Sequence, residues 1–560
     1  MHARHRQYEA LRAFFLEQLP SHQVARAFGY TPGSFRVLCH QFRRDPDPQF
    51  FSSPSPGPRE QPLKSRARDL VVTLRKQNHS VYEISEALKE HGTPLSPTAV
   101  REVLRAEGFA PLPRRGDDER LEHVGPSAEP VADVRRFALS AGMQFTTRCG
   151  GLFLFLPDLV RLRLDTLAAA AKLPGSKMIP AAHALRCALV LKLWSIERKS
   201  HIMALVTDPG LALFCGLNAI PKKSYLCEYS SRTDRAATTA MLAAWHRAVA
   251  VHQLFEASSF NLDFHSVPYF GDDPQVQRHF VSARSRAQPS VLAFLAQDAS
   301  GRSFCYSNAD LRKGEEADEI FRFVAFWKRY HRQLPRHLVF DSRLTTYEHL
   351  ARLDRLGITF ITLRRRSAKL LQEVADLPAS AWRRVALDVP ARKYKTPRVF
   401  EQTVHLAGAA LRQLYVVDLG HEEPTILLTN DRRSSHAKLL IRYAQRMLIE
   451  NALSDAVRFF HMDALSSAVG MKVDFDMALL VVASGLYRLL ARRMRGYDDA
   501  QARHIFRDLI DTPADVTVTE TEVLVRFHRR AHLPIIVASG ILGSPVPVPW
   551  WNGYSLRMST

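Results

Sequence analysis

The chain has 560 residues, enough for roughly three to five domains. Hydrophobic residues make up 46% and charged residues 24%, a composition that excludes fibrous, collagen-like and wholly disordered proteins. Lys and Arg number 77 against 56 Asp and Glu, and the net charge of +21 favours a polyanionic partner, either nucleic acid or an anionic membrane. A basic protein without such a partner is the alternative.

No apolar segment is long enough to span a membrane, which requires about 20 apolar residues in a row. The best candidates, residues 181–196 and 477–490, contain arginine or lysine and predict buried helices instead. The first residues lack the apolar core of a secretory signal. Six cysteines without a C-x-x-C pair argue against a zinc module and a disulfide framework. We therefore expect a cytoplasmic protein with buried thiols and no membrane partner.

The N-terminal part predicts two DNA-binding helix pairs. Residues 1–45 have the outline of a helix-turn-helix, with Ser21 and Thr31 as expected N-caps. Residues 46–66 are rich in proline and serine and form the expected linker. Residues 67–125 repeat the helical pattern and predict a second helix-turn-helix domain. A plain pair of antiparallel helices is the alternative for either copy.

The second copy carries clear capping signals. Ser80 and Glu83 have the spacing of a capping box, and Ser96 precedes a proline at the start of the next helix. That helix would place three polar residues along one face, where a major groove can receive them: Thr98, Arg101 and Arg105. We expect the first two near base edges and the third near phosphate.

The remaining chain changes character several times. The predicted parts are a helical domain at 126–255, a core in two parts at 256–366 and 435–490, a β-rich insertion at 367–434, and a C-terminal domain at 491–560. The first part of the core is predicted to contain three strands followed by helix, strand, helix and strand. This order indicates an α/β fold with a mixed sheet. One long helix is expected over about 435–460.

Three acidic residues in this core are candidates for chemistry. Asp263 and Asp341 lie in or after apolar runs, where open α/β sheets bind ligands. Tyr443, Arg446 and Glu450 have the spacing of one helix face. Each signal alone has a structural explanation, because an aspartate often caps a turn and Arg446 can simply pair with Glu450 on the surface.

Together the three carboxylates suggest a metal site. Carboxylate oxygens are the ligands that Mg²⁺ prefers, and a converging set can hold two ions, with Mn²⁺ as a substitute. Two such ions would activate a water or 3′-hydroxyl and stabilise the leaving oxygen of a phosphodiester. We therefore assign metal binding and catalysis to Asp263, Asp341 and Glu450.

Basic residues near these motifs are candidates for contacts with the DNA backbone. They follow the strand after Asp341 or lie in the β-rich insertion: Arg364, Arg365, Arg366, Arg392, Lys393 and Lys395. A solvated charged surface is the alternative. His265, His461 and Asp463 lie near the acidic motifs and are possible supporting groups, although isolated histidines are usually structural.

With these residues in place, the chain resembles the DDE transposases of bacterial insertion sequences, which have an RNase H-like catalytic core. Asp263, Asp341 and Glu450 match the acidic triad in order, and Tyr443-x-x-Arg446-x-x-x-Glu450 is similar to the signature helix of the branch with a β-rich insertion. The segments GLALFCGLNAIPKKSYLCEYSSRT and FFHMDALSSAV also look similar to this group. The family pattern has a lysine seven residues after the glutamate, whereas this chain has Val457 followed by Arg458.

The resemblance implies a magnesium-dependent transposase that binds the ends of its element, cuts the DNA and transfers the strands to a target. Arg446 would hold a phosphate, Tyr443 would stack on or hydrogen-bond the DNA, and Arg458 would be a weaker strand contact. The implied partners are double-stranded element ends and target DNA, with a homodimer joining two ends in a bacterial nucleoid. The alternatives are a domesticated, non-catalytic DNA-binding regulator and a stand-alone RNase H-like nuclease.

Overall fold

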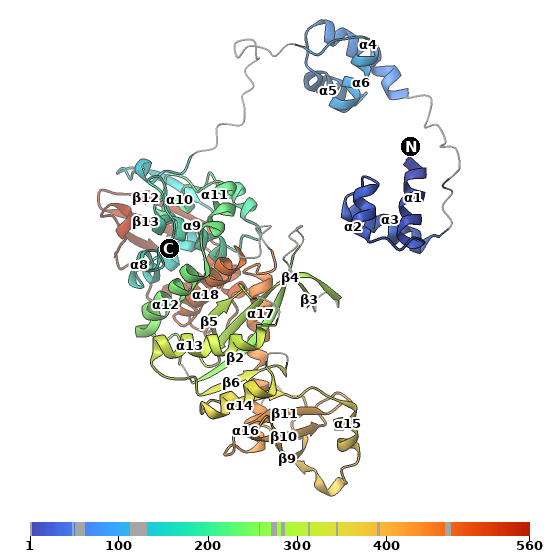
Figure 1. The fold of residues 1–560 in the computed structure, drawn as a ribbon. Coiled ribbons are helices and arrows are strands. Elements are labelled where there is room, and N and C mark those ends of the chain that lie inside the picture. Colours follow the sequence, from blue (N-terminus) through green and yellow to red (C-terminus); the bar gives the residue numbers. More distant parts are fainter. Residues whose placement is uncertain are drawn as a thin grey trace. The chain divides into compact units, whose positions relative to one another are not determined.

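The computed structural model of the protein describes residues 3–46, 50, 62–112, 131–256, 258–269, 277–281, 286–311, 314–342, 345–388, 393–464 and 472–560. The chain divides into two compact units, Met1–Gly125 and Pro126–Thr560 (Figure 1). The predicted mixed α/β class is confirmed. In the described ranges no helix is long and apolar enough to cross a membrane. All six cysteines are free, and only Cys227 is not fully buried.

The first unit contains two groups of three helices, each around its own core. The first group is α1 (Ala3–Phe15), α2 (Ser21–Ala27) and α3 (Pro32–Arg44), and the second is α4 (Pro62–Lys76), α5 (Val81–Glu90) and α6 (Pro97–Ala106). Phe35 and Val24 are buried in the first core, and Val71, Leu88 and Val100 in the second. The apolar face of each helix thus has a partner inside its own group.

The helix caps mostly follow the sequence signals. Thr31 accepts a hydrogen bond from the backbone of Ser34, and Ser96 caps α6 in the same way. Ser80 and Glu83 form the predicted capping box at α5. The prediction for Ser21 is wrong: Pro20 occupies the N-cap with an extended backbone, and Ser21 is the first helical residue of α2. The proline fixes φ, so it sets the start of this helix one residue earlier.

The second unit contains a largely buried helical part. Its helices are α7 (Leu156–Arg161), α8 (Leu164–Ala170), α9 (Ala181–Leu193), α10 (Pro209–Cys215), α11 (Lys223–Tyr229), α12 (Arg235–Val249), α18 (Lys472–Ala491), α19 (Ala502–Ile505) and α20 (Leu533–Ala538). α18 contacts α9, α12 and strand β5 (Ser303–Asn308). The two apolar segments considered as membrane spans are therefore the buried helices α9 and α18, as predicted.

A five-stranded sheet joins segments that are far apart in sequence. Its strand order is β1 (Gln144–Thr147), β12 (Ala514–Val518), β13 (Glu522–Phe527), β15 (Ser555–Ser559) and β14 (Val546–Pro547). β1 comes from the segment predicted as a helical domain, and the other strands come from the predicted C-terminal domain. The two segments also share one hydrophobic core, which includes Leu152 and Val516.

A ten-stranded mixed sheet is the centre of the remaining part of the second unit. Its strand order is β3 (Arg278–Val281), β4 (Arg286–Asp298), β2 (Ser259–Pro268), β6 (His337–Phe340), β7 (Thr359–Leu363), β11 (Thr425–Thr429), β10 (Ala409–Val417), β9 (Arg398–Leu406) and β8 (Arg383–Arg384), with β5 also paired to β4. β2, β6 and β7 are parallel neighbours, and the other pairs are antiparallel. The predicted β-rich insertion extends this sheet, since β11 pairs with β7.

The helices that accompany this sheet are α13 (Glu319–His331), α14 (Tyr347–Arg355), α15 (Ala368–Ala375), α16 (His436–Ala444) and α17 (Met447–Arg458). The predicted single helix over 435–460 is wrong, because the chain turns at Gln445 and Arg446. There the backbone makes tighter i to i−3 bonds, from Arg446 N to Tyr443 O (2.9 Å) and from Ile449 N to Arg446 O (3.0 Å).

Candidate active site

The register of the central sheet brings two aspartates side by side. β2 and β6 run parallel, and their last paired residues are Leu262 and Phe340. The next position on each strand is an aspartate, Asp263 and Asp341. Asp263 is not the last residue of its strand, because β2 continues to Pro268, where it still pairs with β4. The site lies where β6 stops and β2 loses one of its neighbours.

Two buried amides fix α17 over these strands. Asn261 on β2 donates to the backbone oxygen of Gln445 (3.4 Å), and Gln297 on β4 donates to that of Leu448 (3.3 Å). Both amide side chains are almost fully buried and bond to each other. Because side chains alternate along a strand, Asn261 and Asp263 point to the same face of β2. The break between α16 and α17 is therefore held directly above the aspartates.

Arg446 connects all three predicted carboxylates. Its Nη1 lies 2.6 Å from Glu450 Oε1, and its Nη2 lies 3.0 Å from Asp263 Oδ2 and 3.9 Å from Asp341 Oδ2. The Arg446 side chain is only 14% exposed, whereas that of Glu450 is 51% exposed. The ion pair that was considered as a surface alternative is therefore one part of a partly buried cluster of four charged groups.

Burial and charge act in opposite directions in this cluster. Burial raises the pKa of Asp263, although the positive charge of Arg446 works against it. Burial also opposes the charge of Arg446, but the surrounding carboxylates outweigh it and raise the pKa of the guanidinium. The pKa of Tyr443 is raised, mainly by burial. Three formal negative charges face one positive charge, so the cluster retains an excess of negative charge.

The cluster lies in a cavity of about 780 Å³. Besides the triad and Arg446, the cavity is lined by His265 and Asp463, whose Nε2 and Oδ1 atoms are 2.6 Å apart. His461, by contrast, bonds to Ser195 and has a structural role. The cavity is also lined by residues that the sequence did not indicate, among them His279, Phe280, Glu316, Thr345 and Thr346.

The predicted backbone-contact residues fall into three groups. Arg365 lines the cavity. Arg364 bonds to Gln413 and Tyr347, and Arg366 pairs with Glu423, so both have partners within the chain. The exposed group, available to a ligand, comprises Lys393, Lys395 and Arg458. Arg392 lies outside the described residues.

The predicted base-reading face of α6 is exposed. Thr98, Arg101 and Arg105 all face solvent, whereas Val100 and Leu104 of the same helix are buried. The helix is thus amphipathic, with its polar face free to meet a ligand.

The donor set fits a divalent cation in type and charge. Carboxylate oxygens are the ligands that Mg²⁺ prefers, and the excess negative charge of the cluster would be neutralised by a dication. Within the described part of the chain, however, no group of three or more His, Cys, Asp or Glu side chains is close enough to hold a metal. The carboxylates are gathered around the guanidinium instead.

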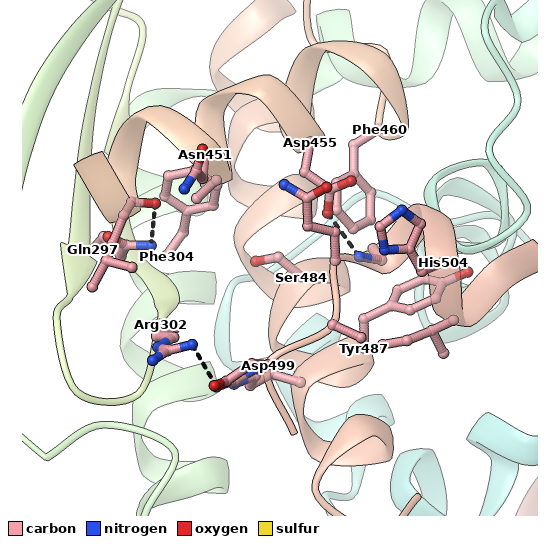
Figure 2. Close-up of a pocket in the computed structure, with 17 residues that line it drawn as sticks. Gln297, Arg302, Phe304, Asn451, Asp455, Phe460, Ser484, Tyr487, Asp499 and His504 are labelled. Carbon is pink, nitrogen blue, oxygen red and sulfur yellow. Dashed lines mark hydrogen bonds and ion pairs between the residues drawn. The ribbon is translucent and has the colours of Figure 1, made fainter. Parts of the chain in front are cut away.

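A second cavity of about 320 Å³ lies on the opposite face of α17. Figure 2 shows Asp455 beside His504, and Arg302 paired with Asp499 at 2.5 Å. Asp499 also lies 3.4 Å from Arg488. Asp455 Oδ2 accepts a hydrogen bond from the backbone of Ala502 (2.8 Å), which starts α19. The hydrogen bond from Ala502 connects α17 to the chain that follows α18, and the Asp499 ion pairs connect that chain to α18 and to the turn between β4 and β5.

No family model matches the sequence, and no curated protein is similar to it. Solved structures that are similar to the chain include three transposase complexes. A piggyBac transposase synaptic complex with hairpin DNA is 11% identical, with a TM-score of 0.33, over 65% of this chain and 84% of that one. A pre-cleavage Mos1 transpososome is 10% identical, with a TM-score of 0.13, over 66% of this chain and 79% of that one.

A Mos1 mariner paired-end complex with Mn is 10% identical to this chain, with a TM-score of 0.10, over 67% of this chain and 90% of that one. Identities and TM-scores are low in all three cases. The function proposed below therefore rests on the residues and their geometry.

Proposed function

We propose that this protein is a DDE-type DNA transposase of a bacterial insertion sequence, which binds the ends of its element and catalyses metal-dependent strand cleavage and strand transfer. The observation that carries the proposal is the meeting of Asp263, Asp341 and Glu450 around Arg446 in one cavity. These residues come from two adjacent strands and a helix far away in sequence. An accidental surface ion pair would involve two charged groups, whereas this cluster involves four.

The strand order supports an RNase H-like core. Five strands of the core lie in the order β5, β4, β2, β6 and β7, with β4 antiparallel to its neighbours and β2, β6 and β7 parallel. This is the arrangement that the resemblance to DDE transposases implies. The first aspartate is then on the central strand, the second follows the neighbouring strand, and the glutamate is on the helix that packs against them.

In this mechanism Asp263, Asp341 and Glu450 would hold divalent metal. The metal, Mg²⁺ or Mn²⁺, would supply Lewis-acid activation of the attacking water or 3′-hydroxyl and neutralisation of the leaving oxygen. Arg446 binds a phosphate oxygen of the cleaved strand through its planar guanidinium, which suits phosphate recognition. Arg365 contributes a second positive charge on the wall of the same cavity. Tyr443, just before the turn, contacts the DNA beside Arg446.

The first unit would locate the element ends as a pair of helix-turn-helix domains. α6 would lie in the major groove, with Thr98 and Arg101 near base edges and Arg105 near phosphate. The net charge of +21 supports binding to the phosphate backbone. Two element ends must be joined for transposition, so we expect a homodimer to act on them in the nucleoid.

A cleavage and joining assay with Mg²⁺ on DNA that carries the flanking ends of the element tests the proposal. Wild type is expected to cut and join, while Asp341→Asn is expected to bind the ends without cutting them. Asp376→Asn is a matched control, because Asp376 is an exposed residue at the end of α15. Binding without cutting in Mg²⁺ or Mn²⁺ would favour the non-catalytic regulator, and cutting without joining would favour the stand-alone nuclease.

A further inference from the structure

Arg446 lies between the three carboxylates that would hold a divalent ion. Its two terminal nitrogens lie within 2.6–3.9 Å of one oxygen from each of Asp263, Asp341 and Glu450. A guanidinium is planar and presents its donors in a fork, so a single side chain can reach several carboxylates at once. These carboxylate oxygens are therefore already paired with a positive charge, which competes with a divalent ion.

The guanidinium is not fully satisfied in this position. Arg446 Nε is buried and has no hydrogen-bond partner among the described residues. A buried donor without an acceptor costs free energy. The cavity beside it is open and large enough for part of a nucleic-acid strand. An incoming phosphate oxygen would supply the missing acceptor, and phosphate binds guanidinium through two parallel hydrogen bonds.

We propose that Arg446 is a switch between two sets of anions: without DNA it neutralises the three carboxylates and competes with divalent metal, and a DNA phosphate draws it away and frees them. This inference rests on the proposed function and adds regulation to the same site. The protein then assembles its metal centre fully only when DNA is present, which limits cleavage to bound substrate.

The switch predicts a thermodynamic coupling between metal and DNA. The apparent metal affinity of a protein falls in proportion to the fraction of molecules that are competent to bind. If Arg446 is paired with the carboxylates in most molecules, its removal raises the fraction of molecules that are competent to bind metal. By linkage, a ligand that withdraws Arg446 strengthens metal binding by the same factor as metal strengthens the binding of that ligand.

Mn²⁺ binding to the full-length protein without DNA tests the competition. Electron paramagnetic resonance measures free Mn²⁺ directly. The Mn²⁺ sites that are lost in Asp263→Asn are those formed by Asp263, Asp341 and Glu450. We expect Arg446→Gln to bind Mn²⁺ at these sites about tenfold more tightly than wild type. Arg355→Gln is the matched control, because it removes the same charge from an exposed position at the end of α14, outside the cavity.

Arg355→Gln is expected to change Mn²⁺ affinity by less than about threefold, since exposed charges are strongly screened. Equal affinities in Arg446→Gln and Arg355→Gln would overturn the proposal. Arg446→Lys provides a second variant in case the glutamine protein does not fold, which circular dichroism reports. A lysine ammonium is a point charge that cannot bridge three carboxylates, so we expect an affinity between those of wild type and Arg446→Gln.

The same Mn²⁺ binding measurement is then repeated with duplex DNA of mixed sequence at low salt, because phosphates are common to all DNA sequences. DNA is expected to strengthen Mn²⁺ binding by about tenfold in wild type and only slightly in Arg446→Gln. An equal gain in both proteins would overturn the role of Arg446 as the link. This result differs from failure of the proposed function, in which Asp263→Asn would leave Mn²⁺ binding unchanged and wild type would not cut DNA.

Discussion

The cavities on the two faces of α17 differ in whether their charged side chains are balanced by partners. Arg446 and Glu450 project from one face, into a cavity where three carboxylates share one guanidinium. Asp455 projects from the other face, where it accepts a backbone hydrogen bond, and nearby Asp499 pairs with two arginines (Figure 2). The first cavity has unbalanced charge, and the second has balanced charge.

This difference indicates that one face of α17 serves a catalytic site and the other face stabilises the fold. A folded chain gains nothing by gathering like charges, so a cluster with excess negative charge is most simply explained by a ligand that completes it. Charges that already have partners connect structural elements. Substitutions on the first face of α17 should therefore change DNA cleavage, and substitutions on the other face should change the stability of the fold.

The largest expected effect is on the acidic face. Glu450→Gln removes one ionised oxygen ligand while keeping the shape of the side chain, and DNA cleavage should slow by about 10²-fold or more. Binding of the element ends, measured by mobility shift, should remain. The rate constant for cleavage in Mg²⁺ is the quantity to measure. A rate within a few-fold of wild type would place the chemistry elsewhere.

On the opposite face we expect a loss of stability instead. Asp455→Ala removes a buried acceptor from the backbone of Ala502 and should cost about 1–3 kcal/mol of unfolding free energy. The melting temperature should fall by about 1–3 °C in calorimetry, because the unfolding entropy of so large a unit is high. Cleavage per folded molecule should be preserved. Asp455→Ala with normal stability and lost cleavage would contradict the division between the two faces.

A smaller effect is expected at the edge of the second cavity. Asp499 is 66% exposed and pairs with Arg302 and Arg488. Exposed ion pairs contribute up to about 1 kcal/mol, so Asp499→Asn should lower the unfolding free energy by less than that. Urea denaturation of the variant and wild type measures the difference. A loss as large as that of Asp455→Ala would mean that these ion pairs stabilise the fold more than the exposure of Asp499 indicates.

The smallest effect is a pH dependence. Burial raises the pKa of Asp455, while the backbone of Ala502 acts in the opposite direction. The folded protein therefore holds this proton more tightly than the unfolded chain. Wild type should lose stability relative to Asp455→Asn as the pH rises from about 4, the ordinary aspartate value, through the raised pKa. Melting temperatures of both proteins over this window test the sign, and a gain by wild type would contradict it.

Local signals in the sequence predicted much of the site. The apolar runs before Asp263 and Asp341, and the spacing of Arg446 and Glu450, are visible in single segments. The capping residues Ser80 and Ser96 are equally local. Such features depend on residues a few positions apart, so they can be recognised without knowing the fold.

Other features depend on contacts between distant segments. The break in the helix at Gln445 is held by Asn261 and Gln297, two polar residues within buried strands. Their polarity inside apolar runs was the available signal, but their partners are set only by the sheet register. The pairing of β1 with β12 is likewise a long-range contact. These interactions arise from tertiary packing, which overrides local preference.

The most direct test of the central claim is the position of Mn²⁺ in crystals of the full-length protein with DNA, determined from its anomalous scattering. We predict a peak bounded by the carboxylates of Asp263, Asp341 and Glu450, with the Arg446 guanidinium withdrawn to a phosphate. A peak elsewhere, or an Arg446 still bound to the three carboxylates beside fully bound DNA, would contradict it.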